Sequence, residues 1–211
     1  MSTTSIPAGR RVLADAVTGR RSLATDLALI AAGTVIVALL AQVSVPLWPV
    51  PITGQTLGVV IVGAALGAWR GAASLALYLV AGLAGLPIFA DFTGGPLSVL
   101  KPSFGFVIGF VFAAFAIGWL AERDWDRRFW PALAGFLAAS VIPFLFGVPY
   151  LAAVLGGLGL DNSLTAVMQA GVYPFVLGGV VKAVVAAAAV PLAWKAVKAV
   201  DSRRSGPSER G

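Results

Sequence analysis

The sequence predicts an all-α membrane protein with six transmembrane helices in a single bundle and both termini in the cytoplasm. The 211 residues are 59% hydrophobic and only 11% charged, whereas soluble domains are about half apolar and about a quarter charged. At roughly 30 residues per span and loop, the chain has room for about six helices. With six spans, most of the Lys and Arg residues fall on the side that carries both termini, and this is the side that the positive-inside rule assigns to the cytoplasm.

Apolar runs set the order of the elements along the chain. Residues 1–21 are polar, 22–198 are expected to form the transmembrane domain, and the polar tail 199–211 is expected to be disordered. The turn between the second and third spans is tight and holds only Arg70. The spans are expected at Leu23–Val43, Thr56–Trp69, Gly71–Leu86, Phe104–Ala121, Phe129–Phe146 and Tyr173–Val197.

Three connecting segments are too apolar, or too rich in proline and glycine, to be ordinary polar loops. Ser44–Gln55 holds three prolines and cannot be a continuous helix, and Gly85–Ser103 is rich in Gly and Pro. Val148–Gly171 is mostly apolar, and its middle is expected to hold a short packed helix. Irregular backbone at membrane depth must be buried in protein or line a cavity. Since all three segments fall on the outer side, they are expected to form lids or walls of an outward-opening pocket.

The side assigned to the cytoplasm carries thirteen of the fifteen basic residues. The charged run Glu122–Arg128 is expected there as a solvated turn, and Asp26 at the start of the first span is expected to snorkel to the interface. Five tryptophans at the predicted cytoplasmic ends are expected to be interfacial anchors: Trp69, Trp119, Trp125, Trp130 and Trp194. The thirteen basic residues are Arg10, Arg11, Arg20, Arg21, Arg70, Arg123, Arg127, Arg128, Lys195, Lys198, Arg203, Arg204 and Arg210.

Lys182 stands alone in an apolar run of the last span and is the main candidate for a binding residue. A mid-span lysine costs about 3 kcal/mol on insertion scales. It lies about 12 Å along the helix from Pro174 at 1.5 Å per residue, so a snorkelling lysine is one interpretation. The favoured interpretation is a cation for an anionic ligand group. Gly178 and Gly179 precede it by one turn and leave space on that face for a ligand.

Polar residues at the mouth of the second span are a second group of candidates. Thr53, Gln55 and Thr56 supply donors and acceptors beside a proline-rich segment. For the two threonines, N-capping of the helix is an equally good interpretation. Gln55 is a weaker cap, and it is therefore the better candidate for binding.

Aromatic and glycine residues of the second outer segment are a third group. Phe89 and Asp91 stand beside Gly94 and Gly95, a composition that suits a flexible lid over an apolar ligand. Interfacial anchoring is the alternative role for the aromatic residue. The same choice between binding and anchoring applies to Tyr150 and Tyr173.

Several classes of function are excluded by what the sequence lacks. The absence of Cys and His removes thiol chemistry, imidazole metal sites and His acid–base catalysis, and no paired acids lie within the spans, so no catalytic or metal site and no enzyme activity are expected. There is no phosphate-binding Gly-x-x-x-x-Gly-Lys-Ser/Thr loop, so the chain should not bind ATP by itself. The net charge of +6 reflects orientation in the lipid bilayer rather than nucleic-acid binding.

Four stretches, in order along the chain, resemble the BioY family, the biotin-binding S component of energy-coupling factor (ECF) vitamin transporters. The resemblance covers about residues 25–195. The stretches are Val50–Leu57 (VPITGQTL), Gly85–Ala90 (GLPIFA) with Gly94 and Gly95, Pro102–Phe110 (PSFGFVIGF) and Pro174–Lys182 (PFVLGGVVK).

The resemblance implies a six-helix S-component fold, biotin as the ligand, and docking to a transmembrane coupling subunit and two ABC-type ATPases in the cell membrane. Ala28 and Ala32 resemble the small-residue face by which S components contact the coupling subunit. Family members commonly carry an Asp three residues before the lysine of the last motif, where this chain has Gly179. Together, the residues and the resemblance give these ligand-binding candidates: Thr53, Gln55, Thr56, Phe89, Asp91, Gly94, Gly95, Phe104, Tyr150, Tyr173, Gly179 and Lys182.

The sequence therefore predicts a biotin-binding membrane subunit for vitamin uptake, with no cofactor beyond the ligand. The missing Asp at position 179 keeps open an S component for a different vitamin. A biotin carrier that acts without ATPase partners, and a purely structural subunit, are further alternatives. Whether the chain works alone, as a homo-oligomer or only with ATPases is left open by the sequence.

Overall fold

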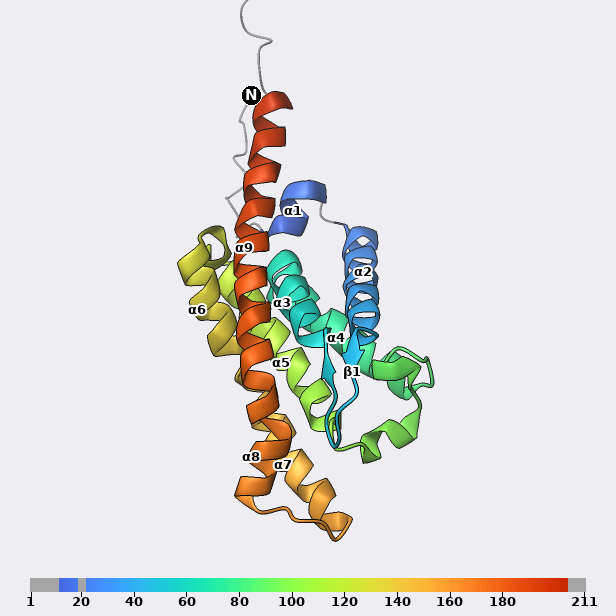
Figure 1. Ribbon diagram of the computed structural model, residues 1–211. Helices are drawn as coiled ribbons and strands as arrows, with labels where there is room; N and C mark the ends of the chain where they lie inside the picture. The colour runs from blue at the N-terminus through green and yellow to red at the C-terminus, as the bar shows by residue number, and fades with distance from the viewer. Residues whose placement is uncertain (1–11, 19–21, 205–211) are drawn as a thin grey trace, which may run out of the picture.

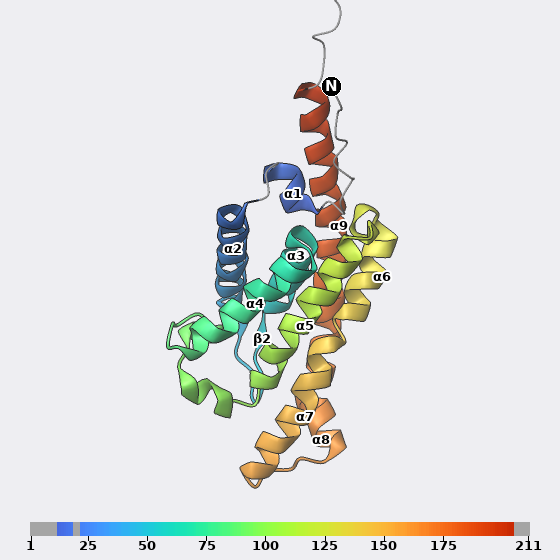
Figure 2. The same ribbon diagram turned by 180° about the vertical axis from the view of Figure 1, so that it is seen from behind.

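The computed structural model describes residues 12–18 and 22–204, which form a helical bundle (Figure 1). Helix α1 and the end of α9 lie at one end of the molecule, and α7 and α8 extend at the other (Figures 1 and 2). The α-helices are α1 (Leu13–Thr18), α2 (Leu23–Ala41), α3 (Gln55–Leu66), α4 (Ala68–Leu83), α5 (Phe104–Ala121), α6 (Phe129–Ala139), α7 (Ile142–Gly157), α8 (Leu164–Gly171) and α9 (Tyr173–Arg204).

The first connecting segment folds as a small hairpin. Strand β1 (Ser44–Val45) pairs antiparallel with β2 (Ile52–Thr53), with Ser44 opposite Thr53. Proline lacks the N–H that a helix needs, and the three prolines lie in the loop that joins the strands. The prediction that this segment is not helical is confirmed, but the all-α class overlooked the hairpin.

Within the described residues, four apolar helical stretches are long enough to cross a membrane, as judged from length and composition. Helices α3 and α4 are also apolar but have only 12 and 16 residues, fewer than the roughly 20 of a straight span. Both lie where the second and third spans were predicted. The four long stretches are Leu23–Ala41, Phe104–Ala121, Phe129–Gly157 and Leu164–Val200.

The turn between α3 and α4 lies at Gly67, so its predicted position at Arg70 is wrong. Gly67 has φ +88°, a conformation that favours glycine, and Arg70 lies in the first turn of α4. A Cβ on Gly118 of α5 would lie 2.2 Å from the carbonyl carbon of Gly67. Helix α5 therefore crosses this turn in direct backbone contact.

The third connecting segment is more helical than predicted. The fifth span breaks at Ser140 and Val141, and α7 then continues to Gly157 with Pro149 inside it. Pro143 is in the first turn of α7, where a missing N–H costs no helical hydrogen bond. Only residues 158–163 are irregular before α8, so the short helix lies at the end of this segment rather than in its middle, where it was predicted.

Both predicted polar ends contain helix. Helix α1 falls within the N-terminal polar segment, and Val12 and Ala14 are buried against the bundle. Helix α9 continues to Arg204. The last span was predicted to end at Val197 and the disordered tail to begin at residue 199, whereas the helix runs past both positions. The basic residues predicted at 10, 11, 20, 21 and 210 lie outside the described residues, as does the rest of the tail from residue 205.

The charged segment between α5 and α6 is not a solvated turn. It contains the 3-10 helix η3 (Trp125–Arg127), and the side chain of Asp126 is only 1% exposed. Asp126 Oδ2 accepts a hydrogen bond of 2.6 Å from the indole Nε1 of Trp194. The guanidinium of Arg127 lies 3.3 Å from the centroid of the Trp194 ring. Trp194 is therefore a buried packing residue rather than an interfacial anchor, whereas the other four tryptophans are exposed.

Ion pairs join α1, α2 and α4 at the same end of the molecule. Arg70 Nη1 lies 2.7 Å from Asp15 Oδ1, and Arg70 Nη2 lies 2.8 Å from Asp26 Oδ1. Asp26 therefore pairs with Arg70 instead of snorkelling alone. Glu122 Oε1 accepts a 2.9 Å hydrogen bond from the backbone N–H of Ala68, at the start of α4. These contacts fix α1, α2, α4 and α5 relative to one another.

Candidate ligand-binding cavity

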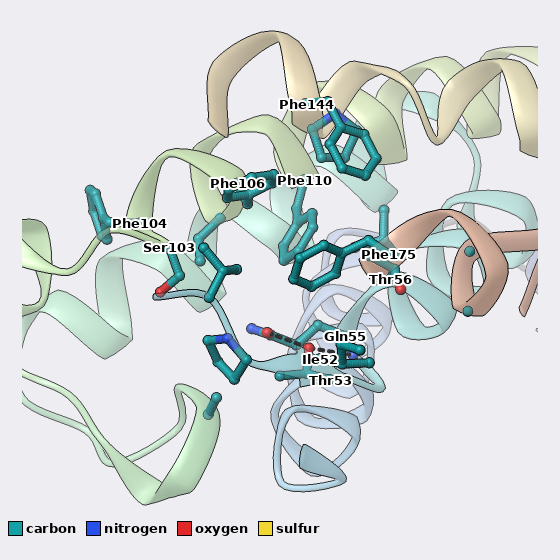
Figure 3. Close-up of a pocket in the computed structure, with 18 of the residues that line it drawn as sticks. Ile52, Thr53, Gln55, Thr56, Ser103, Phe104, Phe106, Phe110, Phe144 and Phe175 are labelled. Carbon is teal, nitrogen blue, oxygen red and sulfur yellow. Dashed lines mark hydrogen bonds between the residues drawn. The ribbon is translucent and has the colours of Figure 1, made fainter. Parts of the chain in front are cut away.

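A cavity of about 360 Å³ opens in the bundle (Figure 3). Its walls come from the β1–β2 hairpin, the first turns of α3, the segment that precedes α5, one face of α5 from Phe104 to Ile117, the α6–α7 junction and the first half of α9. Two of the three predicted lid segments, the first and second, thus contribute to the wall. The volume falls within the roughly 300–1,000 Å³ typical of small-molecule sites.

Aromatic side chains form much of the apolar wall. Phe106 of α5 stacks on Phe175 of α9, with ring centroids 6.3 Å apart, and meets Phe144 of α7 edge-on at 5.7 Å. Figure 3 shows these rings converging from different helices. Such a wall suits a compact apolar ring system. The phenylalanines of the wall are Phe89, Phe104, Phe106, Phe110, Phe144 and Phe175.

Lys182 reaches from α9 toward the start of α3 and lines the cavity. Its Nζ donates to the backbone carbonyl of Thr53 at 2.5 Å and to the hydroxyl of Thr56 at 3.0 Å. Within residues 12–18 and 22–204, no carboxylate forms an ion pair with it. Lys182 is a half-buried ammonium held by neutral oxygens inside the bundle, which argues against the snorkelling interpretation.

Gly178 and Gly179 of α9 leave part of the cavity wall open. A Cβ built on either residue would meet no atom within 4 Å. Both line the cavity, as the sequence predicted for this glycine pair. At position 179 the chain therefore presents free space one turn from the Lys182 ammonium.

Thr53 and Gln55 belong to a buried hydrogen-bond network at the base of the hairpin. The Thr53 hydroxyl donates to Gln55 Oε1 at 2.8 Å (Figure 3). Gln55 Nε2 donates in turn to the hydroxyl of Tyr78 at 2.7 Å. The N-cap residue of α3 is Gly54, which makes no side-chain cap. The Thr53 hydroxyl accepts a hydrogen bond from the Gln55 N–H at 3.3 Å. Thr53 thus satisfies a backbone donor in the first turn of α3, although it lies one residue before the N-cap.

The second outer segment contributes part of its predicted residues to the cavity. Phe89 is buried and packs edge-on against Tyr78 with centroids 5.3 Å apart, while Asp91 is exposed on the cavity wall. Gly94 and Gly95 are not on the wall. Gly95 has φ +93°, and its N–H bonds to the carbonyl of Gly82 at 2.7 Å, so this pair shapes the loop.

The two tyrosine candidates lie away from the cavity wall. Tyr150 donates from its hydroxyl to the backbone carbonyl of Val99, and Tyr173 is 60% exposed at the start of α9. Phe104, by contrast, lines the cavity. The structure thus brings eight of the twelve predicted residues to one cavity: Thr53, Gln55, Thr56, Phe89, Asp91, Phe104, Gly179 and Lys182.

Sequence reasoning missed several polar residues of this region. Tyr78 is fully buried in α4 and orients Gln55, and Ser98 and Lys101 line the cavity from the second outer segment. Lys101 Nζ donates to the hydroxyl of Thr93 at 2.9 Å. Lys101 is an isolated basic residue on the predicted outer side of the membrane, and this isolation was the sequence signal that could have identified it.

Comparison with known proteins gives consistent matches. The model described as "BioY family" matches residues 11–199. The biotin transporter BioY of Rhizobium etli is 39% identical over 167 residues, covering 76% of this chain and 86% of the relative. That of Thermotoga maritima is 35% identical over 161 residues, covering 75% and 90%. The crystal structure of the S-component for biotin from an ECF-type ABC transporter matches with a TM-score of 0.64 and 26% identity, covering 83% of this chain and 95% of that one. The family resemblance drawn from the four motifs is confirmed.

Proposed function

Since the chain belongs to the BioY family, we propose that it is a membrane subunit for vitamin uptake that captures biotin in the cavity beside Lys182. The observation that carries the proposal is the Lys182 ammonium, which lines the cavity and, among the described residues, is held by the neutral oxygens of Thr53 and Thr56. An ammonium in this setting gains most from an anion, because two opposite charges attract each other more strongly in the protein interior than in water. The carboxylate of biotin supplies that anion.

The remaining chemistry of biotin suits the rest of the wall. Its bicyclic body is apolar and fits a cavity faced by phenylalanine rings. Its urea needs hydrogen-bond partners, and Asp91, Ser98 and Ser103 offer oxygen atoms on the same wall. Gln55 is held in place by Thr53 and Tyr78 and can present its remaining amide hydrogen. The other predicted candidates, Gly94, Gly95, Tyr150 and Tyr173, act in this proposal through the shape of the surrounding loops.

The proposed orientation has six spans, with both termini in the cytoplasm and the cavity open to the outside. Six apolar helical segments and the one-sided distribution of basic residues support it. Helix α1 and the end of α9 lie at one end of the molecule, and the β1–β2 hairpin, which lines the cavity, lies away from that end (Figure 1). A cavity on that side would take up a solute from outside the cell.

Energy for inward delivery is proposed to come from partners. The sequence has no phosphate-binding loop of its own. Ala28 and Ala32 are both exposed on α2, one turn apart, and leave room for a second helix to approach closely. We infer that this face docks on a transmembrane coupling subunit that carries two ABC-type ATPases. Co-purification with those subunits should be lost in Ala28→Trp/Ala32→Trp protein that still binds biotin, and retained co-purification would rule this face out.

Isothermal titration of the purified protein with biotin tests the central proposal. We expect saturable binding, and binding at least tenfold weaker for biotin methyl ester, which lacks the anionic charge. Absence of saturable biotin binding by protein that unfolds cooperatively would overturn the proposal. Because Gly179 departs from the residue common in the family, riboflavin and thiamine should be tested as competitors of labelled biotin. Displacement by one of them at lower concentration than by biotin would identify an S component for that vitamin instead.

A further inference from the structure

The second outer segment contains a tight turn, Phe89–Thr93, whose backbone is unusual. The N–H of Phe89 bonds to the carbonyl of Thr93 at 2.9 Å, and the N–H of Thr93 bonds to the carbonyl of Ala90 at 3.3 Å. Between them, Asp91 has φ +58° and Phe92 has φ +53°. Two consecutive positive φ values are typical of type I′ turns, which favour Gly, Asn and Asp. For a residue as bulky as phenylalanine this conformation is rare, so surrounding contacts must hold it.

Gln42, the residue that ends α2, supplies those contacts. Its Oε1 accepts from the N–H of Phe92 at 2.9 Å. Its Nε2 donates to the carbonyl of Phe89 at 3.2 Å and lies 3.4 Å from that of Ile88. The same nitrogen donates to the carbonyl of Ala38 at 2.9 Å, which fixes the side chain against its own helix. The side-chain amide of Gln42 therefore forms hydrogen bonds with both sides of the Phe89–Thr93 turn.

Gln42 also lies between the hairpin and the Phe89–Thr93 turn, two segments that line the cavity. Strand β1 begins two residues later, and the N–H of Gly54 at the end of the hairpin bonds to the carbonyl of Val43 at 2.8 Å. The turn itself presents Phe89, Asp91 and Thr93 to the cavity. The end of α2 thus connects the hairpin wall to the wall formed by the turn.

We propose that Gln42 is a positioning residue that holds the Phe89–Thr93 turn against the cavity and so slows the release of a bound ligand. Gln42 is not on the cavity wall, so it acts through the turn rather than by touching the ligand. Without the amide, the φ values of Asp91 and Phe92 can relax to negative values, which withdraws this part of the wall. The use of biotin as the ligand rests on the proposed function.

The variant Gln42→Met tests this, because methionine has a similar length and removes all the polar contacts. We expect the dissociation rate of biotin to rise about tenfold while the association rate changes less than about threefold, since a loosened wall opens more often but still admits the ligand. Amide hydrogen exchange gives a second readout that needs no ligand. The Phe92 N–H, which bonds to Gln42 Oε1, should exchange at least tenfold faster in the variant.

Phe92→Gly in the Gln42→Met background is the matched rescue. Glycine adopts positive φ without steric cost, so the turn should form again and the dissociation rate should return to within about threefold of wild type. A variant that merely loosened the fold would not be rescued by a second substitution at an exposed residue.

The possible results separate this inference from the proposed function. If wild-type protein does not bind biotin, the proposed function fails, and Phe92 exchange still tests Gln42. If biotin binds and Gln42→Met changes neither the dissociation rate nor the exchange at Phe92, the role of Gln42 is wrong. If Gln42→Met does not fold, exchange at Phe92 in Gln42→Glu decides. Glutamate keeps the acceptor but not the donor, so we expect exchange to rise by less than tenfold, and unchanged exchange would overturn the inference.

Discussion

Charged side chains have different partners at the α1 end of the molecule and in the cavity. At the end that carries α1 and η3, cations lie beside carboxylates: Arg70 with Asp15 and Asp26, and Arg127 with Asp126. At the cavity, Lys182 has only a backbone carbonyl and a hydroxyl. These pairs at the first end match charges within the chain, and the two pairs of Arg70 join three helices. The charge in the cavity is held in position without an internal counter-ion in the part of the chain that the structure describes, which leaves it available to a ligand.

Glycines show the same contrast. At the α3–α4 turn, a Cβ on Gly118 would lie 2.2 Å from the backbone of Gly67, whereas a Cβ on Gly179 in the cavity would meet nothing within 4 Å. The first glycine permits two backbones to touch, and the second leaves a cavity wall open. Stability should therefore depend mainly on the first region and ligand binding mainly on the second.

The largest expected effect on stability comes from Gly118→Ala. The added methyl group would overlap backbone atoms that cannot rotate away, and overpacking of this kind costs about 3 kcal/mol. The measurement is the free energy of unfolding in mixed micelles. The control is Gly179→Ala, whose methyl group enters open space and should change stability by less than about 1 kcal/mol. Equal losses in the two variants would contradict the division into a packed end and an open cavity.

Arg70→Met should produce the next largest loss of stability. It leaves two partly buried carboxylates without their cation, and the expected cost of about 2 kcal/mol lies between the values for exposed and buried pairs. Biotin affinity should stay within about twofold of wild type, because the site is at the opposite end. A tenfold loss of affinity in folded Arg70→Met protein would show that the two ends are coupled.

Lys182→Met should weaken biotin binding and leave stability nearly unchanged, which is the opposite of the effect expected for Arg70→Met. Biotin binding should weaken at least tenfold, equivalent to about 1.4 kcal/mol, because the carboxylate loses its cation. The free energy of unfolding should not fall by more than about 0.5 kcal/mol, since the removed charge has no carboxylate partner among the described residues. Calorimetry and unfolding measure the two quantities on one preparation. Lys101→Met is the control: Lys101 is exposed at the cavity mouth, so its loss should weaken binding less than threefold. An unchanged dissociation constant for Lys182→Met would make that lysine structural.

The sequence predicted the order of the helices and some of their boundaries better than the contacts between distant residues. The predicted bounds of the fourth span, Phe104–Ala121, are those of α5, and the start of the last span, Tyr173, is that of α9, because proline and long apolar runs mark them clearly. The sequence misplaces the α3–α4 turn because the charge of Arg70 favours a loop, although Asp15 and Asp26 match that charge inside the fold. Pairing between residues distant in sequence is invisible to a hydropathy pattern.

The same limit explains the outcome for the site. Lys182 was identifiable because a lone cation in an apolar run has few explanations. Gln42 and Tyr78 were missed because a single glutamine or tyrosine near a helix end carries no signal until its partners, Phe92 and Gln55, are known. Tyr150 and Tyr173 were included for their chemistry alone, and the chain directs them away from the cavity wall.

The smallest expected effect concerns Asp126, and it tests whether the charges at the α1 end are fully matched. Burial raises the pKa of the Asp126 carboxyl, although the Trp194 indole and the Arg127 guanidinium oppose the rise and Asp124 adds to it. Asp126 Oδ1 lies 3.3 Å from Arg127 Nε but forms no hydrogen bond with it. A raised pKa means that the folded protein holds the proton more tightly than the unfolded chain, whose carboxyl titrates near pH ~3.9. This contribution is complete below that pH and is lost as the pH rises through the raised pKa.

Asp126→Asn separates the charge of Asp126 from its shape. Asparagine can still accept from the Trp194 indole but does not titrate, and at neutral pH the variant should match wild-type stability within about 1 kcal/mol. The difference in unfolding free energy between wild type and variant, measured from acid to neutral pH, should favour wild type most at the acid end and decline as the pH rises. If the difference instead grows in favour of wild type toward neutral pH, the Arg127 pair outweighs the burial cost. Asp126 would then be as well matched as the carboxylates beside Arg70, and the contrast between the two ends would be complete.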